Sequence, residues 1–217
     1  MENSTPLADA LTRCREGDPS WEEVYDSFVT GLNKVGIGQT APMVGDRLPE
    51  FALPDARGIY VHSQTLLDSG PLVLSFNRGG WCPYCRAELG AWADAMPELW
   101  RMGGSFVSIT PEVGGRAAAM REALGLDAEV LCDVDHGVAL ELGLAFHLGG
   151  NLRQRYLACG LDLSEVYGSP SWFIPIPATF VVDRGGIVRF SFVDPDFRRR
   201  AEPADVLAAL AALPGAN

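Results

Sequence analysis

The chain lacks several features that define large classes of protein. Its 217 residues contain no apolar run close to the roughly 18 residues that a membrane span requires. The first residues are polar and acidic, without the basic start and continuous apolar segment of a secretory signal. We therefore expect a cytoplasmic protein that does not bind membranes.

Basic residues are also scarce. Lysine and arginine number 17 against 28 acidic residues, and the formal net charge of −11 argues against nucleic-acid binding. The one basic cluster is Arg198-Arg199-Arg200, and acidic residues flank it on both sides. This pattern predicts a solvated approach to a helix, not an anion site.

Cysteine is too sparse for a disulfide-stapled scaffold, since the chain has five. Two of them lie close together, in the motif Cys82-Pro83-Tyr84-Cys85. A zinc site would need two further ligands, and the sequence has neither a second CxxC nor a closely spaced histidine pair. We therefore expect no metal and no cofactor. The other three are expected to behave mainly as small apolar residues: Cys14, Cys132 and Cys159.

The remaining residues are rich enough in apolar side chains to bury a core, and their patterning predicts an α/β fold. Residues 1–40 are expected to be a helical extension, and 41–217 a single domain. Short apolar runs alternate with helical patterns, which favours a sheet with parallel crossovers. The expected strands are 51–53, 59–62, 72–76, 105–109, 129–132, 179–182 and 187–193, the last two forming a hairpin.

Helices are expected in the gaps between these strands. A helix should start near Pro83, because proline is favourable in a first helical turn. Others are expected at 116–124, 136–144 and 203–213. Segment 149–170 is the least clear, and we expect an inserted helix and a loop there, with Tyr156 and Leu157 facing inward.

The chemistry of the CxxC motif follows from its place at a helix start. A thiol reacts as its thiolate, and unpaired N–H groups and the helix dipole stabilise an anion at that position. Arg78 and Arg86 are close in sequence and add positive charge. Cys82 is therefore the expected nucleophile and Cys85 the resolving thiol. The Gly79-Gly80 pair should let the loop turn and leave the thiol accessible, with Trp81 covering one side.

Several segments together resemble the alkyl hydroperoxide reductase/thiol-specific antioxidant (AhpC/TSA) family of peroxiredoxins. The order and spacing of the blocks carry the resemblance, over roughly residues 44 to 210. Residues 78–85 are similar to the signature of a peroxiredoxin-like branch. The other matching blocks are Val44-Gly45-Asp46, Pro49 to Asp55 with Gly58, Phe106 to Thr110, Leu131 to Asp135, and Ala178 to Asp183.

The resemblance implies a thioredoxin-like fold, with a central mixed sheet flanked by helices. It also implies an antioxidant peroxidase. In such a reaction Cys82 would become a sulfenic acid, Cys85 would condense with it to a redox-active disulfide, and an external thiol would reduce that disulfide. Thioredoxin, glutaredoxin or a low-molecular-weight thiol would serve as reductant, and a homodimer is consistent with the family.

Two departures from the family pattern concern the peroxide site. Counting back from Cys82, Gly79 and Ser75 occupy the positions of the family's threonine and proline. Pro177 occupies the position of its arginine. A proline there resembles the cis-proline of thioredoxins, which faces the CxxC; the alternative is a rigid turn before a strand. Arg78 is a candidate to replace the missing arginine, so the expected substrate-binding residues are Arg78, Trp81 and Pro177.

Proton transfer and substrate class stay open at this point. The strand 72–76 carries no acid, which leaves water or Glu88 to move protons. The leading hypothesis is a thiol-dependent peroxidase acting on hydrogen peroxide or an organic hydroperoxide. The first alternative is a thiol–disulfide oxidoreductase acting on protein or small-molecule disulfides. The second is a non-catalytic redox sensor or partner-binding module, with the N-terminal helices as its docking surface.

Overall fold

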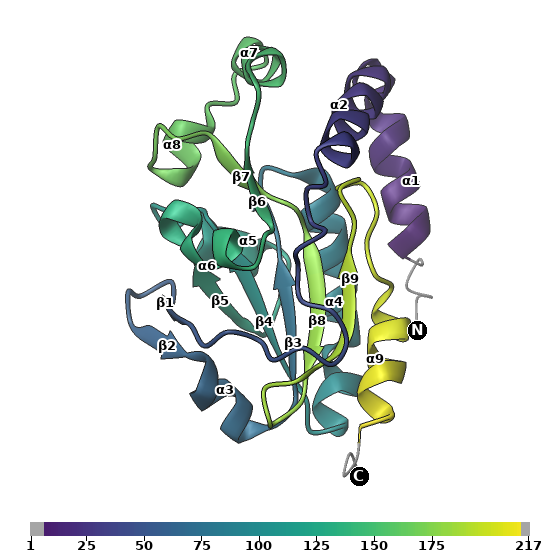
Figure 1. Cartoon of the computed structure of the whole chain (residues 1–217), viewed down its shortest axis with the longest axis vertical. Helices are drawn as coiled ribbons and strands as arrows, with labels where there is room; N and C mark the ends of the chain where they lie inside the picture. Colours follow the sequence, from purple (N-terminus) through teal and green to yellow (C-terminus); the bar gives the residue numbers. More distant parts are fainter. Residues whose placement is uncertain (1–6, 214–217) are drawn as a thin grey trace.

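A mixed β-sheet forms the centre of the computed structural model, which describes residues 7–213 (Figure 1). Within that range the sheet has five strands in the order β5-β4-β3-β8-β9. The strands β3, β4 and β5 run parallel, whereas β8 is antiparallel to both β3 and β9. Their bounds are β3 Leu72–Phe76, β4 Ser105–Thr110, β5 Glu129–Cys132, β8 Ala178–Val182 and β9 Val188–Val193.

The unbroken apolar run Leu72–Phe76 forms the central strand β3. All five of its residues are buried, because both faces of the sheet are covered. Leu74 pairs with Val107 on one side and Phe180 on the other. The strand therefore sits deep in the core and ends directly before the loop that carries the CxxC motif.

Two apolar layers cover the sheet. One layer contains Trp92, Leu99 and Met120. It packs between the sheet and three helices, α4 (Pro83–Arg101), α5 (Arg116–Ala123) and α9 (Pro203–Ala211). The other is covered by β1 (Ala52–Pro54), β2 (Tyr60–His62), α3 (Ser63–Ser69) and α6 (Gly137–Glu141). Burial of these layers supplies the main driving force for the fold.

A further set of elements gathers at one end of the sheet, above the carboxyl end of β3 (Figure 1). Side chains of α2, α7, α8, β6 and β7 share one buried aromatic-rich cluster, and partly buried Trp81 packs against it. The bounds are α1 Leu7–Gly17, a 3₁₀ turn Pro19–Trp21, α2 Glu22–Lys34, β6 Ala145–His147, α7 Gly150–Ala158, α8 Leu163–Tyr167 and β7 Phe173–Pro175. The N-terminal helices thus lie close to the CxxC loop.

Most of the predicted elements are present, with differences at short elements. The hairpin and the parallel core strands are confirmed. The helix α3 and the small β6–β7 pair were not predicted. Tyr156 is buried as expected, but Leu157 is 41% exposed, so its inward placement is wrong. The expected helix 136–144 is a 3₁₀ turn at Val134–His136 followed by α6.

Between residues 7 and 213, no helix is both long enough and apolar enough to cross a membrane.

Candidate active site

Cys82 lies at the N-cap of α4, directly before Pro83 in the first helical turn. The helix N-terminus therefore presents its unpaired N–H groups near the thiol, as predicted. The thiol is enclosed, however: Cys82 is 2% exposed and Cys85 is fully buried. The expectation of an open thiol is wrong because side chains of α1 and α2 pack over the loop.

The loop before Cys82 is held in one conformation by two polar side chains. Asn77 accepts a hydrogen bond from the Gly79 N–H at 3.0 Å, and Glu112 accepts one from the Gly80 N–H at 3.0 Å. Gly79 has a φ of +106°, and a Cβ there would lie 2.2 Å from the Glu112 carboxylate carbon. Only glycine fits this turn, which explains why the first residue of the Gly79-Gly80 pair is glycine.

The two thiols of the motif have opposite acidities. Burial raises the pKa of Cys82, but a hydrogen bond from Cys85 and the positive charges of Arg78 and Arg200 outweigh it and lower this pKa to about 6. Burial and the neighbouring Cys82 raise the pKa of Cys85 well above its usual value. Cys82 is thus the thiolate at neutral pH, which agrees with the predicted division of roles.

Arg78 is almost fully buried, and its guanidinium carbon lies 3.8 Å from the centre of the Phe197 ring. Its Nε donates to the Pro175 carbonyl at 3.2 Å. Its Nη2 has no hydrogen-bond partner anywhere in the described part of the chain. A buried guanidinium with a free donor is costly unless something binds it, which marks this position as a candidate anion or oxygen site.

Arg200 is a second buried arginine beside the motif, although its sequence context predicts a solvated residue. It is 8% exposed, donates from Nη2 to the Cys85 sulfur at 3.4 Å and pairs through Nε with Glu88 at 2.6 Å. It also donates to the backbone carbonyls of Phe197 and Arg199. The prediction that the arginine cluster is solvated is therefore wrong for two of its members, since Arg198 is buried as well.

Glu88 supplies the acid that the strand 72–76 lacks. It is 1% exposed and one helical turn after Cys85. Its Oε1 accepts from Ser75 on β3 at 3.0 Å and from Thr179 on β8 at 3.4 Å. Burial raises the pKa of Glu88, although Arg200 opposes that effect. The raised pKa makes the Glu88 carboxylate a better proton acceptor than an exposed carboxylate.

Pro177 differs from its predicted form. No peptide bond among residues 7–213 is cis, so the expectation of a cis-proline facing the motif is wrong. The contact with the motif comes instead from the carbonyl of Pro175, which binds Arg78. Pro177 is buried and lies directly before β8. Its role in substrate binding stays a prediction.

Trp81 packs against the apolar cluster that contains Cys82 and Cys85. Its indole N–H donates to the Tyr167 hydroxyl at 3.1 Å, and that hydroxyl donates to the Arg78 carbonyl at 2.9 Å. These two hydrogen bonds fix both ends of the loop before Cys82. Arg86, by contrast, is exposed, and the charges that lower the pKa of Cys82 are those of the buried arginines.

The sequence matches the model of the AhpC/TSA family over residues 44–191. The chain belongs to this family. It is therefore an oxidoreductase of the peroxiredoxin-like, thiol-dependent peroxidase class, as the resemblance implied. A curated relative, "Putative peroxiredoxin Rv1608c" of Mycobacterium tuberculosis (strain H37Rv), is 31% identical over 108 residues, which are 50% of this chain and 70% of the relative.

Solved structures show that this AhpC/TSA member has the thioredoxin-like fold of peroxiredoxins. The peroxidoxin BcpB of Mycobacterium tuberculosis aligns with a TM-score of 0.63 at 24% identity, over 80% of this chain and 99% of that one. A reduced Prx3 of Vibrio vulnificus in complex with hydrogen peroxide aligns with a TM-score of 0.61 at 19% identity, over 77% and 98%. The predicted fold class is thus confirmed.

Proposed function

We propose that the protein reduces hydrogen peroxide or a small organic hydroperoxide through Cys82 and Cys85. The Cys82 thiolate attacks one peroxide oxygen, the O–O bond breaks, and the other oxygen leaves as an alkoxide or hydroxide that takes up a proton. Cys82 is then a sulfenic acid. The Cys85 thiol displaces its oxygen as water and forms the Cys82–Cys85 disulfide. Two external thiols return both cysteines to the reduced state.

The free donor of Arg78 is the observation that favours this substrate. Negative charge develops on the leaving oxygen as the O–O bond breaks, and a buried hydrogen-bond donor stabilises such charge strongly. The Arg78 Nη2 is buried without a hydrogen-bond partner among residues 7–213, and the Arg78 charge lowers the pKa of Cys82. In this proposal Arg78 takes the place of the arginine that the family pattern has at the position of Pro177.

Arg200 and Glu88 support the second step. Cys85 has a raised pKa, so its proton must be removed before or during attack on the sulfenic acid. Arg200 donates to the Cys85 sulfur and therefore favours its anionic form. Glu88 is the nearby group able to accept the proton, because burial raises its own pKa. We infer that these two residues assist resolution, and that the Arg200 charge also helps to keep Cys82 ionised for the attack on peroxide.

The thiol–disulfide oxidoreductase alternative loses one of its two supports. It depended on the CxxC motif, which is present, and on a cis peptide bond at Pro177, whereas every peptide bond among residues 7–213 is trans. A disulfide of a folded protein would also have to reach the sulfur of Cys82, a residue that is 2% exposed. A small peroxide needs far less room, so the buried thiol favours the peroxidase.

Rapid mixing of the reduced protein with hydrogen peroxide tests the proposal. We expect single-turnover oxidation much faster than that of free cysteine at a matched thiolate fraction, and one Cys82–Cys85 disulfide by peptide mass mapping. Parallel assays with insulin and with glutathione disulfide measure the alternative activity. Oxidation no faster than free cysteine, with turnover of either disulfide, would replace the peroxidase by the oxidoreductase. A lack of turnover in every assay would favour the redox sensor.

A further inference from the structure

The N-terminal segment Leu7–Lys34, called the cover below, lies over the redox pair. Helix α1 contacts α4, and Leu7 and Leu11 are buried in the same apolar cluster as Cys82 and Cys85. Tyr25 and Phe28 of α2 pack against that cluster from the side. The sulfur that has to meet its reaction partners is therefore enclosed by side chains from the start of the chain.

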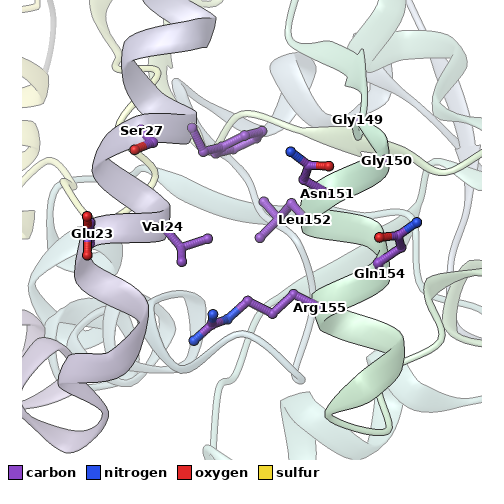
Figure 2. Close-up of a pocket in the computed structure, with 10 residues that line it drawn as sticks. Glu23, Val24, Ser27, Gly149, Gly150, Asn151, Leu152, Gln154 and Arg155 are labelled. Carbon is purple, nitrogen blue, oxygen red and sulfur yellow. The ribbon is translucent and has the colours of Figure 1, made fainter.

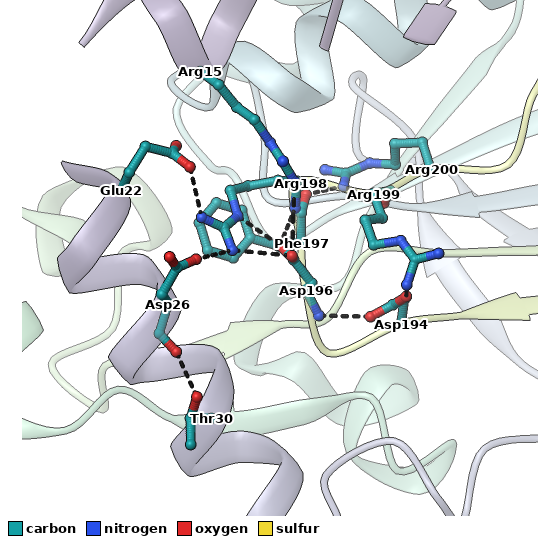
Figure 3. A network of polar contacts seen from close by, with 10 residues as sticks. All are labelled: Arg15, Glu22, Asp26, Thr30, Asp194, Asp196, Phe197, Arg198, Arg199 and Arg200. Atoms are coloured by element: carbon teal, nitrogen blue, oxygen red, sulfur yellow. Dashed lines mark hydrogen bonds and ion pairs between the residues drawn. The ribbon is translucent and has the colours of Figure 1, made fainter. Parts of the chain in front are cut away.

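Arg198 ties the cover to the rest of the protein. It lies in the loop between β9 and α9 and is 5% exposed. Its guanidinium pairs with Glu22 at 3.0 Å and Asp26 at 2.6 Å, both on α2, and with Asp196 of its own loop at 2.8 Å (Figure 3). The side chain of Asp26 is 66% exposed, so water and salt reach this end of the network. Ion pairs of this kind are weakened by salt.

The same loop also touches the redox pair. Phe197 packs edge-on against Tyr25 of the cover, with ring centres 4.8 Å apart, and its face carries the Arg78 guanidinium. Three residues after Phe197, Arg200 reaches the Cys85 sulfur. Phe197, Arg198 and Arg200 of one loop thus contact the cover, the Arg78 guanidinium and the resolving thiol, so displacement of the cover would alter the surroundings of both cysteines.

Space for such a displacement exists on the other side of α2. A pocket of about 950 Å³ separates part of α2 from α7. Val24 and Leu152 face each other across it, and Phe28 also lines it (Figure 2). Arg155 of α7 bridges the gap by donating to the Ser20 carbonyl at 2.9 Å. The contact between α2 and α7 is therefore incomplete, although side chains of both helices share one apolar cluster.

We propose that the cover is an access gate for the redox pair and that Arg198 is its latch. The closed gate admits small hydroperoxides. Reduction of the Cys82–Cys85 disulfide by a protein thiol requires the open gate, because the attacking thiolate must approach one sulfur and form a mixed disulfide before the second thiolate displaces it. The inference rests on the proposed function and adds the size of the partner that each state accepts.

Chemical labelling of reduced Cys82 tests the gate without peroxide. The rates of modification by iodoacetamide and by a bulky polymer-linked maleimide are compared, with the modified residue identified by peptide mass mapping. The latch variant is Glu22→Gln/Asp26→Asn, which removes both α2 partners of Arg198. The control is Glu16→Gln/Glu23→Gln, because these are exposed carboxylates in the cover that form no ion pair within residues 7–213.

We expect the latch variant to raise the maleimide rate about tenfold, since each partly exposed ion pair changes an opening equilibrium by up to about fivefold. The iodoacetamide rate should change less than about twofold, and the control should label like the wild type. Added salt should accelerate maleimide labelling of the unmodified protein. That measurement needs no variant and therefore does not depend on how well the substitutions fold.

The gate is refuted if maleimide labelling is unchanged in the latch variant and insensitive to salt, or if the control accelerates equally. These outcomes are independent of peroxide chemistry. Rapid oxidation with no gating in the labelling assay overturns the gate alone. Gated labelling of a thiol that peroxide does not oxidise quickly overturns the proposed function alone.

Discussion

Substitution of Arg78 should slow the oxidation of Cys82 by peroxide far more than the alkylation of the same thiol. Replacing Arg78 by methionine removes both a positive charge beside Cys82 and the unpartnered Nη2. A single opposite charge at close range shifts a pKa by about 1–3 units. Because the Cys85 hydrogen bond and Arg200 remain, we expect a rise of about one unit from the wild-type pKa of about 6.

The size of that shift sets the expected effect of charge alone. At pH 7, a pKa near 6 leaves about 90% of Cys82 as thiolate, and a pKa near 7 leaves about 50%. Alkylation by iodoacetamide, which depends on the thiolate, should therefore slow about twofold. Loss of a buried donor to a developing oxyanion typically costs about 100-fold or more. Oxidation by hydrogen peroxide should slow by at least that factor.

The assay is the ratio of the two second-order rate constants, each measured on the same preparation. Arg78→Lys is the matched control, because it keeps the charge and changes the donor geometry; its alkylation rate should stay close to wild type while peroxide oxidation falls. If both rates of the methionine variant decreased by the same factor, Arg78 would act only through its charge. If neither decreased, the assignment of Arg78 to the peroxide site would be wrong.

Three further predictions concern the pair and its supports. The rate of Cys82 alkylation should reach half its maximum near pH 6 and level off at higher pH, because a thiol with a pKa of about 6 is mostly ionised above that pH. A midpoint near the ordinary thiol pKa would refute the lowered pKa. Glu88→Gln should reduce the free energy of unfolding in urea by ~3–5 kcal/mol by stranding the Arg200 charge, whereas Glu88→Leu/Arg200→Met should recover most of it. Gly79→Ala should destabilise by ~1–3 kcal/mol through its positive φ and the clash with Glu112, while the control Gly90→Ala, inside α4 with no atom within 4 Å of the added Cβ, should be neutral or stabilising. Equal effects of the two glycine substitutions would contradict the account of the loop.

Much of the fold could be read from local patterns. The strand Leu72–Phe76 and the helix start at Pro83 follow from an unbroken apolar run and from the favourable first-turn proline. The elements that were missed are short: α3 has seven residues, and β6 and β7 three each. Such segments carry too few periods for a pattern to show, and tertiary contacts decide their conformation.

The part of the candidate site that could be predicted is formed by residues close together in the sequence. The CxxC motif, Gly79 and Arg78 are neighbours, and the order of the two thiols followed from the helix start. Arg200 is 115 residues from Cys85, and its setting among acidic residues gave it the pattern of a solvated group. No local signal distinguishes such an arginine from a surface residue. The burial of Cys82 was missed for the same reason, since it depends on where α1 and α2 pack.

The division between an attacking Cys82 and a resolving Cys85 is the central claim, and trapping the sulfenic acid tests it most directly. Reduced Cys85→Ser is treated with one equivalent of hydrogen peroxide in the presence of a sulfenate-specific dione, and the labelled residue is identified by mass spectrometry. The account predicts oxidation at a rate near wild type with the label on Cys82, and loss of rapid oxidation in Cys82→Ser. Rapid oxidation of Cys82→Ser with the label on Cys85 would contradict it.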